Sequence, residues 1–349
     1  MTSMRVCWFG SYDPSYPRND ILLSGLRENG VRVIECRADQ KDKSRRRVLR
    51  TRLRELEGEF DVVYAAHPAE VPVILAKLTT RKPVVMDALY SMYDAVVNDR
   101  QELPWFHPRA LLLWVLDWVA ALLADRIVVD TKEHAAYWSR FPLVSAKKMH
   151  IVYTGVQDTI FYPEEVPVHE GFLVSFHGLY IPLQGIDKIV EAAHLLKDHT
   201  DIRFRFIGSG QLSKKIDAQI ERLGLTTIER LGRKTPDEIR RLSQEADVIL
   251  GVFGDTEKAK RVVPNKVFEG MALKKPVITM DAPAVYEAFS KDELFLIPNT
   301  AEVLANAILA LKQDAIYRQE LAERGYRAVM ERYTPQAVAR SLAPVFENL

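Results

Sequence analysis

Short apolar runs alternate with longer amphipathic segments along this chain, and the alternation occurs twice in succession. Strand-like runs separated by helical patterns are typical of βαβ units in a parallel sheet. The first series runs from 4–9 to residue 153, and the second runs from 172–177 to 294–297. The sequence therefore predicts two α/β domains, each a doubly wound parallel sheet that binds ligands at the carboxyl ends of its strands.

The composition changes between residues 157 and 171, where prolines and acidic residues interrupt the regular pattern. We interpret this segment as a linker. It separates an N-terminal Rossmann-like domain (1–160) from a C-terminal one (170–330), and a closing helix (331–349) can return to the first domain. Two Rossmann-like domains facing each other across a cleft would offer a ligand site, because ligands commonly bind at domain interfaces.

Composition excludes several classes of protein. The 349 residues are 48% hydrophobic with a net charge of +1, which fits a globular protein and gives no global charge for nucleic acid. The two cysteines, Cys7 and Cys36, supply neither a disulfide framework nor a metal-binding spacing. The first residues do not match a signal peptide, so we expect a cytoplasmic protein. We also expect no metal site.

Two segments of the first domain allow contact with a membrane. Segment 41–55 carries eight basic residues and one acidic residue before Glu55, as basic amphipathic helices on anionic membrane surfaces do. Segment 110–124 is apolar except for Asp117, but it is shorter than the ~20 residues that span a bilayer. The same patterns also fit a solvated basic helix at 41–55 and a buried apolar helix at 110–124. Peripheral contact at the inner face of a membrane is therefore one of two interpretations.

Segment 261–279, RVVPNKVFEGMALKKPVIT, combines a helix start with two opposite charges. Pro264 suits the first turn of a helix, where backbone N–H groups can hold an anion. Lys266 in that turn opposes the helix dipole, which indicates an anion nearby, and Glu269 lies on the same face. A cation for phosphate and a carboxylate for hydroxyl groups would hold a nucleotide, although a surface Lys–Glu pair gives the same spacing.

This segment resembles glycosyltransferase family four, whose members carry a Glu-(Ala/Gly)-Met-Ala helix before a basic-Pro-Val-Ile strand. The matching residues are FEGMALKKPVIT (268–279), IGSGQL (207–212), FHGLYIPLQGIDKIVEAA (176–193), LGRKTPDEIRRLSQEADVIL (231–250) and DRIVVDTKEHAAYWS (125–139). The resemblance implies a GT-B fold and retaining transfer of a sugar from a nucleotide sugar to an acceptor hydroxyl. It implies no cofactor and no essential metal. The acceptor stays open, and a lipid-linked or glycan acceptor, as in cell-surface glycan or glycolipid synthesis, is one alternative.

The resemblance also assigns donor-binding residues. Glu269 matches the glutamate that binds the nucleotide ribose. The other expected donor-binding residues are Lys266, Arg261, Asn265, Gly178, Gly185, Gly208 and Gly210.

The chain departs from the family pattern at three of its positions. Arg261 replaces the first glutamate of the spaced pair, and Leu179 and Gln184 replace the two cations of the phosphate-approaching loop. We expect the missing charge to come from the basic residues Lys258, Lys260, Arg261 and Lys266.

Residues after the predicted strands of the first domain are candidates for catalysis. We expect Asp87 and His67 to be catalytic, since carboxylates at strand ends position hydroxyl groups. Candidate contacts to the acceptor or the sugar are Tyr12, Arg18, Ser91, Asp94, Arg100 and His134. Helix caps, local ion pairs and a structural histidine are the alternatives for Asp94, Arg100, His134 and His67.

Two other functions fit the same pattern. One is a GT-B epimerase that acts on a nucleotide sugar without an acceptor. The other is a non-catalytic relative that binds a nucleotide or a partner, which the missing glutamate and loop cations keep open.

Overall fold

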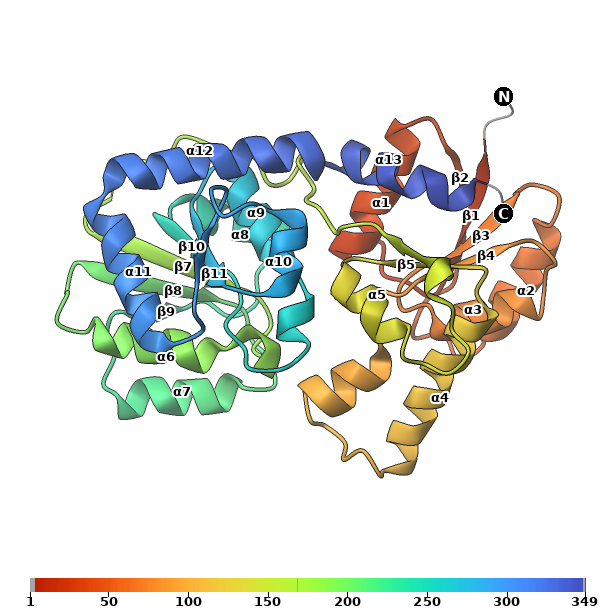
Figure 1. Cartoon of the computed structure of the whole chain (residues 1–349), viewed down its shortest axis with the longest axis horizontal. Coiled ribbons are helices and arrows are strands. Elements are labelled where there is room, and N and C mark those ends of the chain that lie inside the picture. Colours follow the sequence, from red (N-terminus) through yellow and green to blue (C-terminus); the bar gives the residue numbers. More distant parts are fainter. Residues whose placement is uncertain (1–3, 168, 348) are drawn as a thin grey trace. The chain divides into compact units, whose positions relative to one another are not determined.

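The computed structural model describes residues 4–167, 169–347 and 349. It divides into two compact units, which are described separately below (Figure 1). Unit 1 comprises residues 1–155 together with 333–349, and unit 2 comprises residues 156–332. The sequence placed these boundaries at 160–170 and at 331.

Unit 1 is built on a six-stranded parallel sheet in the order β2-β1-β3-β4-β5-β6. Its strands are β1 (Arg5–Gly10), β2 (Arg32–Arg37), β3 (Val62–Ala65), β4 (Val84–Asp87), β5 (Arg126–Val129) and β6 (Met149–Ile151). Its α-helices are α1 (Pro17–Glu28), α2 (Arg45–Glu55), α3 (Glu70–Lys77), α4 (Pro108–Leu123), α5 (Lys132–Trp138) and α13 (Pro335–Phe346). A π-helix at Asp94–Asp99 and a 3-10 helix at Ala146–Lys148 complete the unit.

Alternate residues of β1 face two separate hydrophobic layers. Val6 and Trp8 pack in a layer with residues of α1 and α13, whereas Cys7 and Phe9 pack in a layer with residues of α2 to α5. Because helices cover both faces, the strands read as continuous apolar runs. Both cysteines are buried and free.

Two local features of these segments are clear only in the structure. Helix α1 begins at Pro17, because proline is suited to the first helical position, and Asp20 lies in the first turn. The segment interpreted as a linker belongs to unit 2, where Glu164 forms a 2.5 Å ion pair with Arg240 and Tyr162 lies under the same guanidinium group. Composition missed this contact because Arg240 lies in a distant helix.

Unit 2 contains a second six-stranded parallel sheet in the order β12-β11-β10-β7-β8-β9. The strands are β7 (Phe172–His177), β8 (Ile202–Ile207), β9 (Ile228–Arg230), β10 (Val248–Leu250), β11 (Val277–Met280) and β12 (Phe295–Ile297). The α-helices are α6 (Ile186–Leu195), α7 (Ser213–Arg222), α8 (Pro236–Gln244), α9 (Asn265–Ala272), α10 (Pro283–Ala288), α11 (Ala301–Gln313) and α12 (Ala315–Arg332). Two 3-10 turns are η3 (Pro182–Gln184) and η4 (Ala259–Arg261).

The two parallel sheets confirm the predicted pair of α/β domains, and each strand that the sequence predicted is present. In unit 2 the strand order reverses at β7, which lies between β8 and β10. Ligands of doubly wound folds bind at such a switch point. Over the described part of the chain, no helix has the length and apolarity needed to cross a bilayer.

Candidate functional site

The backbone segments that follow β7 and β8 approach each other closely at the carboxyl ends of these strands. Gly178 follows β7 and Gly208 follows β8, with a φ of +140° at Gly208. A Cβ atom on Gly208 would lie 1.9 Å from the carbonyl oxygen of Gly178, so only glycine fits. Because both residues are glycines, the backbone at the switch point carries no side chain there, and a ligand can approach it closely.

The ammonium group of Lys266 lies beside this backbone. Lys266 is the second residue of α9, it is 4% exposed, and its Nζ donates a hydrogen bond to Oε1 of Gln184. The same Nζ lies 3.7 Å from the centre of the Phe176 ring. A Cβ atom on Gly178 would lie 2.9 Å from it. Lys266 therefore places a cation at the loop in which Leu179 and Gln184 supply none.

The pKa of Lys266 depends on what occupies the site. Burial lowers it well below its usual value, and the nearby charge of Glu269 only partly opposes this effect. A bound anion would favour the charged ammonium group and so raise the pKa again. The buried lysine is thus suited to receiving a phosphate group.

Glu269 lies one turn along the same helix and is paired with a histidine. Its Oε2 lies 2.6 Å from Nε2 of His177, and both side chains are buried. A carboxylate can only accept, so Nε2 carries the proton of this bond. The other ring nitrogen of His177 is buried and has no hydrogen-bond partner within the described ranges.

Sequence reasoning missed His177. The signal was available, since His177 is the last residue of a predicted strand and precedes Gly178, the kind of position that singled out His67 in the other domain. Its partner Glu269 is distant in the sequence, and no periodic pattern connects the two.

The remaining expected donor-binding residues lie on neighbouring segments. Gly185 is the N-cap of α6, and Gly210 is so close to Tyr180 that a Cβ atom would lie 2.7 Å from its backbone nitrogen. Asn265 is the first residue of α9, and Arg261 ends η4.

Two of the four expected basic residues are engaged or enclosed in other ways. Lys260 forms a 2.7 Å ion pair with Glu257, and Lys258 is buried.

In unit 1, Arg18 and Asp87 form a fully buried ion pair. The Nη2 atom of Arg18 lies 3.1 Å from Oδ1 of Asp87, and neither side chain is exposed. Arg18 also donates to the carbonyl oxygens of Val152 and Tyr153. Burial raises the pKa of Asp87, although the charge of Arg18 opposes the shift. The full burial and mutual pairing of these two side chains favour a structural pair, and the catalytic role of Asp87 and the contact role of Arg18 stay predictions.

Other candidates in unit 1 are also engaged locally. The hydroxyl of Tyr12 donates to Glu35 (2.7 Å), and Oγ of Ser91 donates to Asp117 (2.5 Å). His67 packs between aromatic rings, with the Tyr90 ring 4.4 Å from its own.

Three further candidates have partners close in sequence. Asp94 accepts from Asn98, Arg100 lies 3.8 Å from Glu102, and His134 pairs with Asp130 in a helix capped by Thr131. These contacts favour the alternatives of caps, local ion pairs and a structural histidine. Roles in sugar or acceptor contact stay predictions.

A metal centre is not evident in the described residues, which contain no group of three or more His, Cys, Asp or Glu side chains arranged to hold a metal ion.

Comparison with known proteins places these features in a family context. Residues 161–328, most of unit 2, match the family model described as Glycosyl transferases group 1. An uncharacterized glycosyltransferase of Methanocaldococcus jannaschii (MJ1178) is 28% identical over 208 residues, which are 57% of this chain and 53% of that protein. The match thus spans about half the length of this curated relative.

Two solved structures resemble the whole chain. Anabaena Alr3699/HepE in complex with UDP-glucose is 16% identical, with a TM-score of 0.73 over 99% of this chain and 100% of its own. Sucrose-phosphate synthase from Thermosynechococcus elongatus is 14% identical, with a TM-score of 0.75 over 98% of both chains. These likenesses show the fold, which is that of GT-B glycosyltransferases. Residues 161–328 of this chain are therefore similar to the Glycosyl transferases group 1 family.

Proposed function

We propose that this protein transfers a sugar from a nucleotide sugar to an acceptor hydroxyl, with unit 2 holding the donor. The observation that carries the proposal is the arrangement at the switch point of unit 2. There a buried ammonium group, a buried carboxylate and side-chain-free backbone lie at the ends of β7, β8 and α9. Lys266 suits the diphosphate and Glu269 suits the ribose hydroxyls, which is the role that the resemblance to family four implies.

The similar structures support this type of donor. Anabaena Alr3699/HepE, which shares the fold of this chain, was solved with UDP and with UDP-glucose. We therefore propose a nucleoside diphosphate sugar as the donor.

The proposed reaction requires the protein to stabilise charge more than to form covalent bonds. The acceptor oxygen forms a bond to the anomeric carbon while the bond from that carbon to the diphosphate oxygen breaks, and the hydroxyl proton leaves with the diphosphate. Cationic groups and backbone N–H groups absorb the charge that develops on the leaving group. We propose retention, as in family four, and no essential metal.

A first prediction concerns Glu269. In a thermal-shift panel of UDP-, GDP-, ADP-, CMP- and dTDP-linked sugars, we expect one nucleotide class to stabilise the wild type. A ligand at a hundred times its dissociation constant stabilises by ~2.7 kcal/mol, which is readily measured. Glu269→Ala is expected to abolish the shift, because it removes the carboxylate and leaves His177 without its partner. Glu191→Ala, on the exposed face of α6, is the control and should shift like the wild type.

The outcome also separates the alternative functions. Binding and release of nucleoside diphosphate in the presence of an acceptor support transfer. Tight binding without turnover of any sugar would support a non-catalytic protein, and no shift from any nucleotide would contradict the donor site itself.

A second prediction concerns the source of positive charge. Lys266→Met and Arg261→Met are expected to weaken donor binding more than Gln184→Ala does. For Lys266, loss of a charge-assisted hydrogen bond of about 1.5–3 kcal/mol corresponds to roughly 10- to 100-fold in affinity. Gln184→Ala keeps the ammonium group of Lys266 and removes only the side chain that accepts one of its hydrogen bonds. Isothermal titration calorimetry measures the affinities, and equal effects of all three substitutions would contradict the assignment.

The stability of the Lys266→Met variant is the control for its effect on donor binding. Replacing a buried lysine with an apolar side chain is not expected to destabilise the ligand-free protein. A normal or raised melting temperature would therefore show that lost binding does not result from unfolding.

A further inference from the structure

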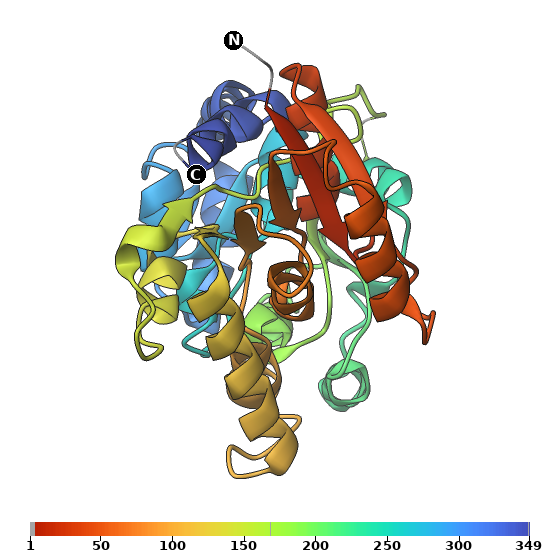
Figure 2. The ribbon, with the colours of Figure 1, turned by 90° about the vertical axis from the view of Figure 1, so that its right-hand side faces the viewer.

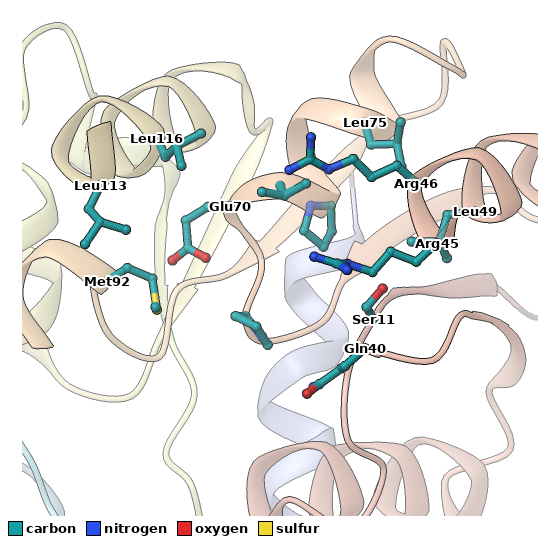
Figure 3. Close-up of a pocket in the computed structure, with 13 residues that line it drawn as sticks. Ser11, Gln40, Arg45, Arg46, Leu49, Glu70, Leu75, Met92, Leu113 and Leu116 are labelled. Atoms are coloured by element: carbon teal, nitrogen blue, oxygen red, sulfur yellow. The ribbon is translucent and has the colours of Figure 1, made fainter. Parts of the chain in front are cut away.

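Unit 1 contains a pocket of about 380 Å³ among α2, α3 and α4, here called the α2–α3–α4 pocket (Figure 3). The segments that follow β1 to β4 also reach it, through Ser11, Gln40, Pro68 and Met92. The pocket therefore lies at the carboxyl-end edge of the unit 1 sheet, where doubly wound folds bind ligands. All of its lining residues belong to unit 1, so the pocket is separate from the donor site proposed in unit 2.

Most of the pocket wall is apolar. Leu49 of α2, Leu75 of α3, and Leu113 and Leu116 of α4 line it together with Met92. Water gains few hydrogen bonds against such a wall, so a hydrocarbon chain is the ligand part that fits it.

Two arginines give the pocket a positively charged side. Arg45 and Arg46 extend from α2 toward its centre, as Figure 3 shows. Among the described residues neither guanidinium group has an ion-pair partner, and Arg45 donates only to the backbone oxygen of Asp42. Two such groups beside an apolar wall suit a phosphate head, since guanidinium groups bind phosphate oxygens in pairs.

The one acidic residue in the wall does not oppose an anion. Glu70 is 5% exposed, and burial together with the neighbouring Asp117 carboxylate raises the pKa of Glu70 to about 8. Burial and the neighbouring carboxylate therefore favour the protonated form of this carboxyl group, which can donate a hydrogen bond to a ligand oxygen.

The helix that forms one wall of the pocket also exposes apolar side chains. Leu111 and Leu112 of α4 are 61% and 56% exposed, and Trp105 and Phe106 precede the same helix with more than two-thirds of their surface exposed. Figure 2 shows that α4 extends away from the sheet of unit 1. A hydrocarbon chain longer than the pocket would meet further apolar surface on this helix.

We propose that the α2–α3–α4 pocket binds an amphiphile with an anionic phosphate head and a linear hydrocarbon chain. The head lies between Arg45 and Arg46, within reach of Glu70. The chain lies against the leucines and the methionine of the wall.

Within the proposed transfer reaction, this amphiphile is the lipid-phosphate part of the acceptor. That assignment rests on the proposed function, but binding of the amphiphile does not. Binding is therefore measured directly, on the full chain and without a donor.

The probe is dodecyl phosphate below its micelle concentration, titrated by calorimetry and by fluorescence of Trp114 and Trp118 on α4. We expect saturable binding. Arg45→Gln/Arg46→Gln is expected to weaken it at least ten-fold. The matched control is Arg47→Gln/Arg50→Gln, which removes the same charge from exposed positions of the same helix and should change affinity less than three-fold. Equal weakening by both double variants would mean a non-specific basic surface and would overturn the proposal.

Two further probes test the two halves of the ligand. Inorganic phosphate and dodecyl maltoside are each expected to bind at least ten-fold more weakly than dodecyl phosphate. Leu116→Gln is expected to weaken dodecyl phosphate without affecting inorganic phosphate. If inorganic phosphate binds as tightly as dodecyl phosphate, the pocket is a simple anion site and the proposal is wrong.

Competition by vesicles identifies the source of the head group. Displacement of dodecyl phosphate by phosphatidylcholine vesicles containing phosphatidic acid indicates a lipid in a bilayer, and no displacement indicates a dispersed single-chain ligand. The same preparations are tested for nucleotide-sugar binding. Donor binding without amphiphile binding would overturn this inference and leave the proposed function intact, whereas the reverse would contradict the function alone.

Discussion

Asp87→Ala is expected to destabilise unit 1 by about 3–5 kcal/mol, because it leaves the guanidinium group of Arg18 buried without its counter-charge. Urea unfolding followed by tryptophan fluorescence measures this effect for unit 1 alone, since all five tryptophans lie there. The half-buried pair Arg5–Asp61 is the control, and Asp61→Ala should change stability by no more than about 1 kcal/mol.

The double variant Arg18→Met/Asp87→Leu separates structure from catalysis. Replacing both charges with apolar side chains removes the uncompensated charge, so a large part of the lost stability should return. Full recovery is not expected, because the carbonyl oxygens of Val152 and Tyr153 lose their donor. A stable double variant that still transfers sugar would establish a structural pair. A stable but inactive one, with donor binding intact, would support the catalytic prediction for Asp87.

Gly208→Ala is expected to abolish donor binding and to destabilise unit 2. The substitution combines a backbone conformation that L-residues avoid, worth about 1–3 kcal/mol, with a Cβ atom 1.9 Å from the Gly178 carbonyl oxygen. The loop after β7 must move to relieve this overlap, and that movement disrupts the surroundings of Lys266. Calorimetric titration with the nucleotide sugar found in the panel measures the binding.

Gly224→Ala is the matched control for this prediction. Gly224 also has a positive φ, but no atom lies within 4 Å of its added Cβ. We therefore expect a loss of about 1–2 kcal/mol from the backbone conformation and unchanged donor affinity. Equal losses of affinity in both variants would show that strain, not the close approach to Gly178, explains the effect of Gly208→Ala.

The strands and the donor-side glycines could be predicted because their signals are local. An apolar run followed by glycine identifies the ends of β7 and β8 without knowledge of any partner. Lys266 and Glu269 were likewise found from helix chemistry and spacing. What the local signal did not contain was His177 as the partner of Glu269, since 92 residues separate them.

The candidates in unit 1 were harder to interpret because polar side chains can serve a ligand or one another. Arg18 and Asp87 are 69 residues apart, and Ser91 and Asp117 are 26 apart, so only the fold reveals that they are paired. The α2–α3–α4 pocket was missed for the same reason. Its wall comes from segments between residues 11 and 116, and no single segment identifies it.

Helix α13 gives the synthesis of this chain a definite order of events. Its residues Val338, Leu342 and Phe346 complete the layer around Trp8 and α1, yet they follow the whole of unit 2 in the sequence. On the ribosome, unit 2 is a continuous segment and can fold as soon as residue 332 has emerged, since domains generally fold as units. One face of the unit 1 sheet stays incompletely covered until α13 has been synthesised. We therefore expect nascent chains that stop before residue 333 to expose apolar surface that chaperones bind, although those chains already contain the whole of unit 2.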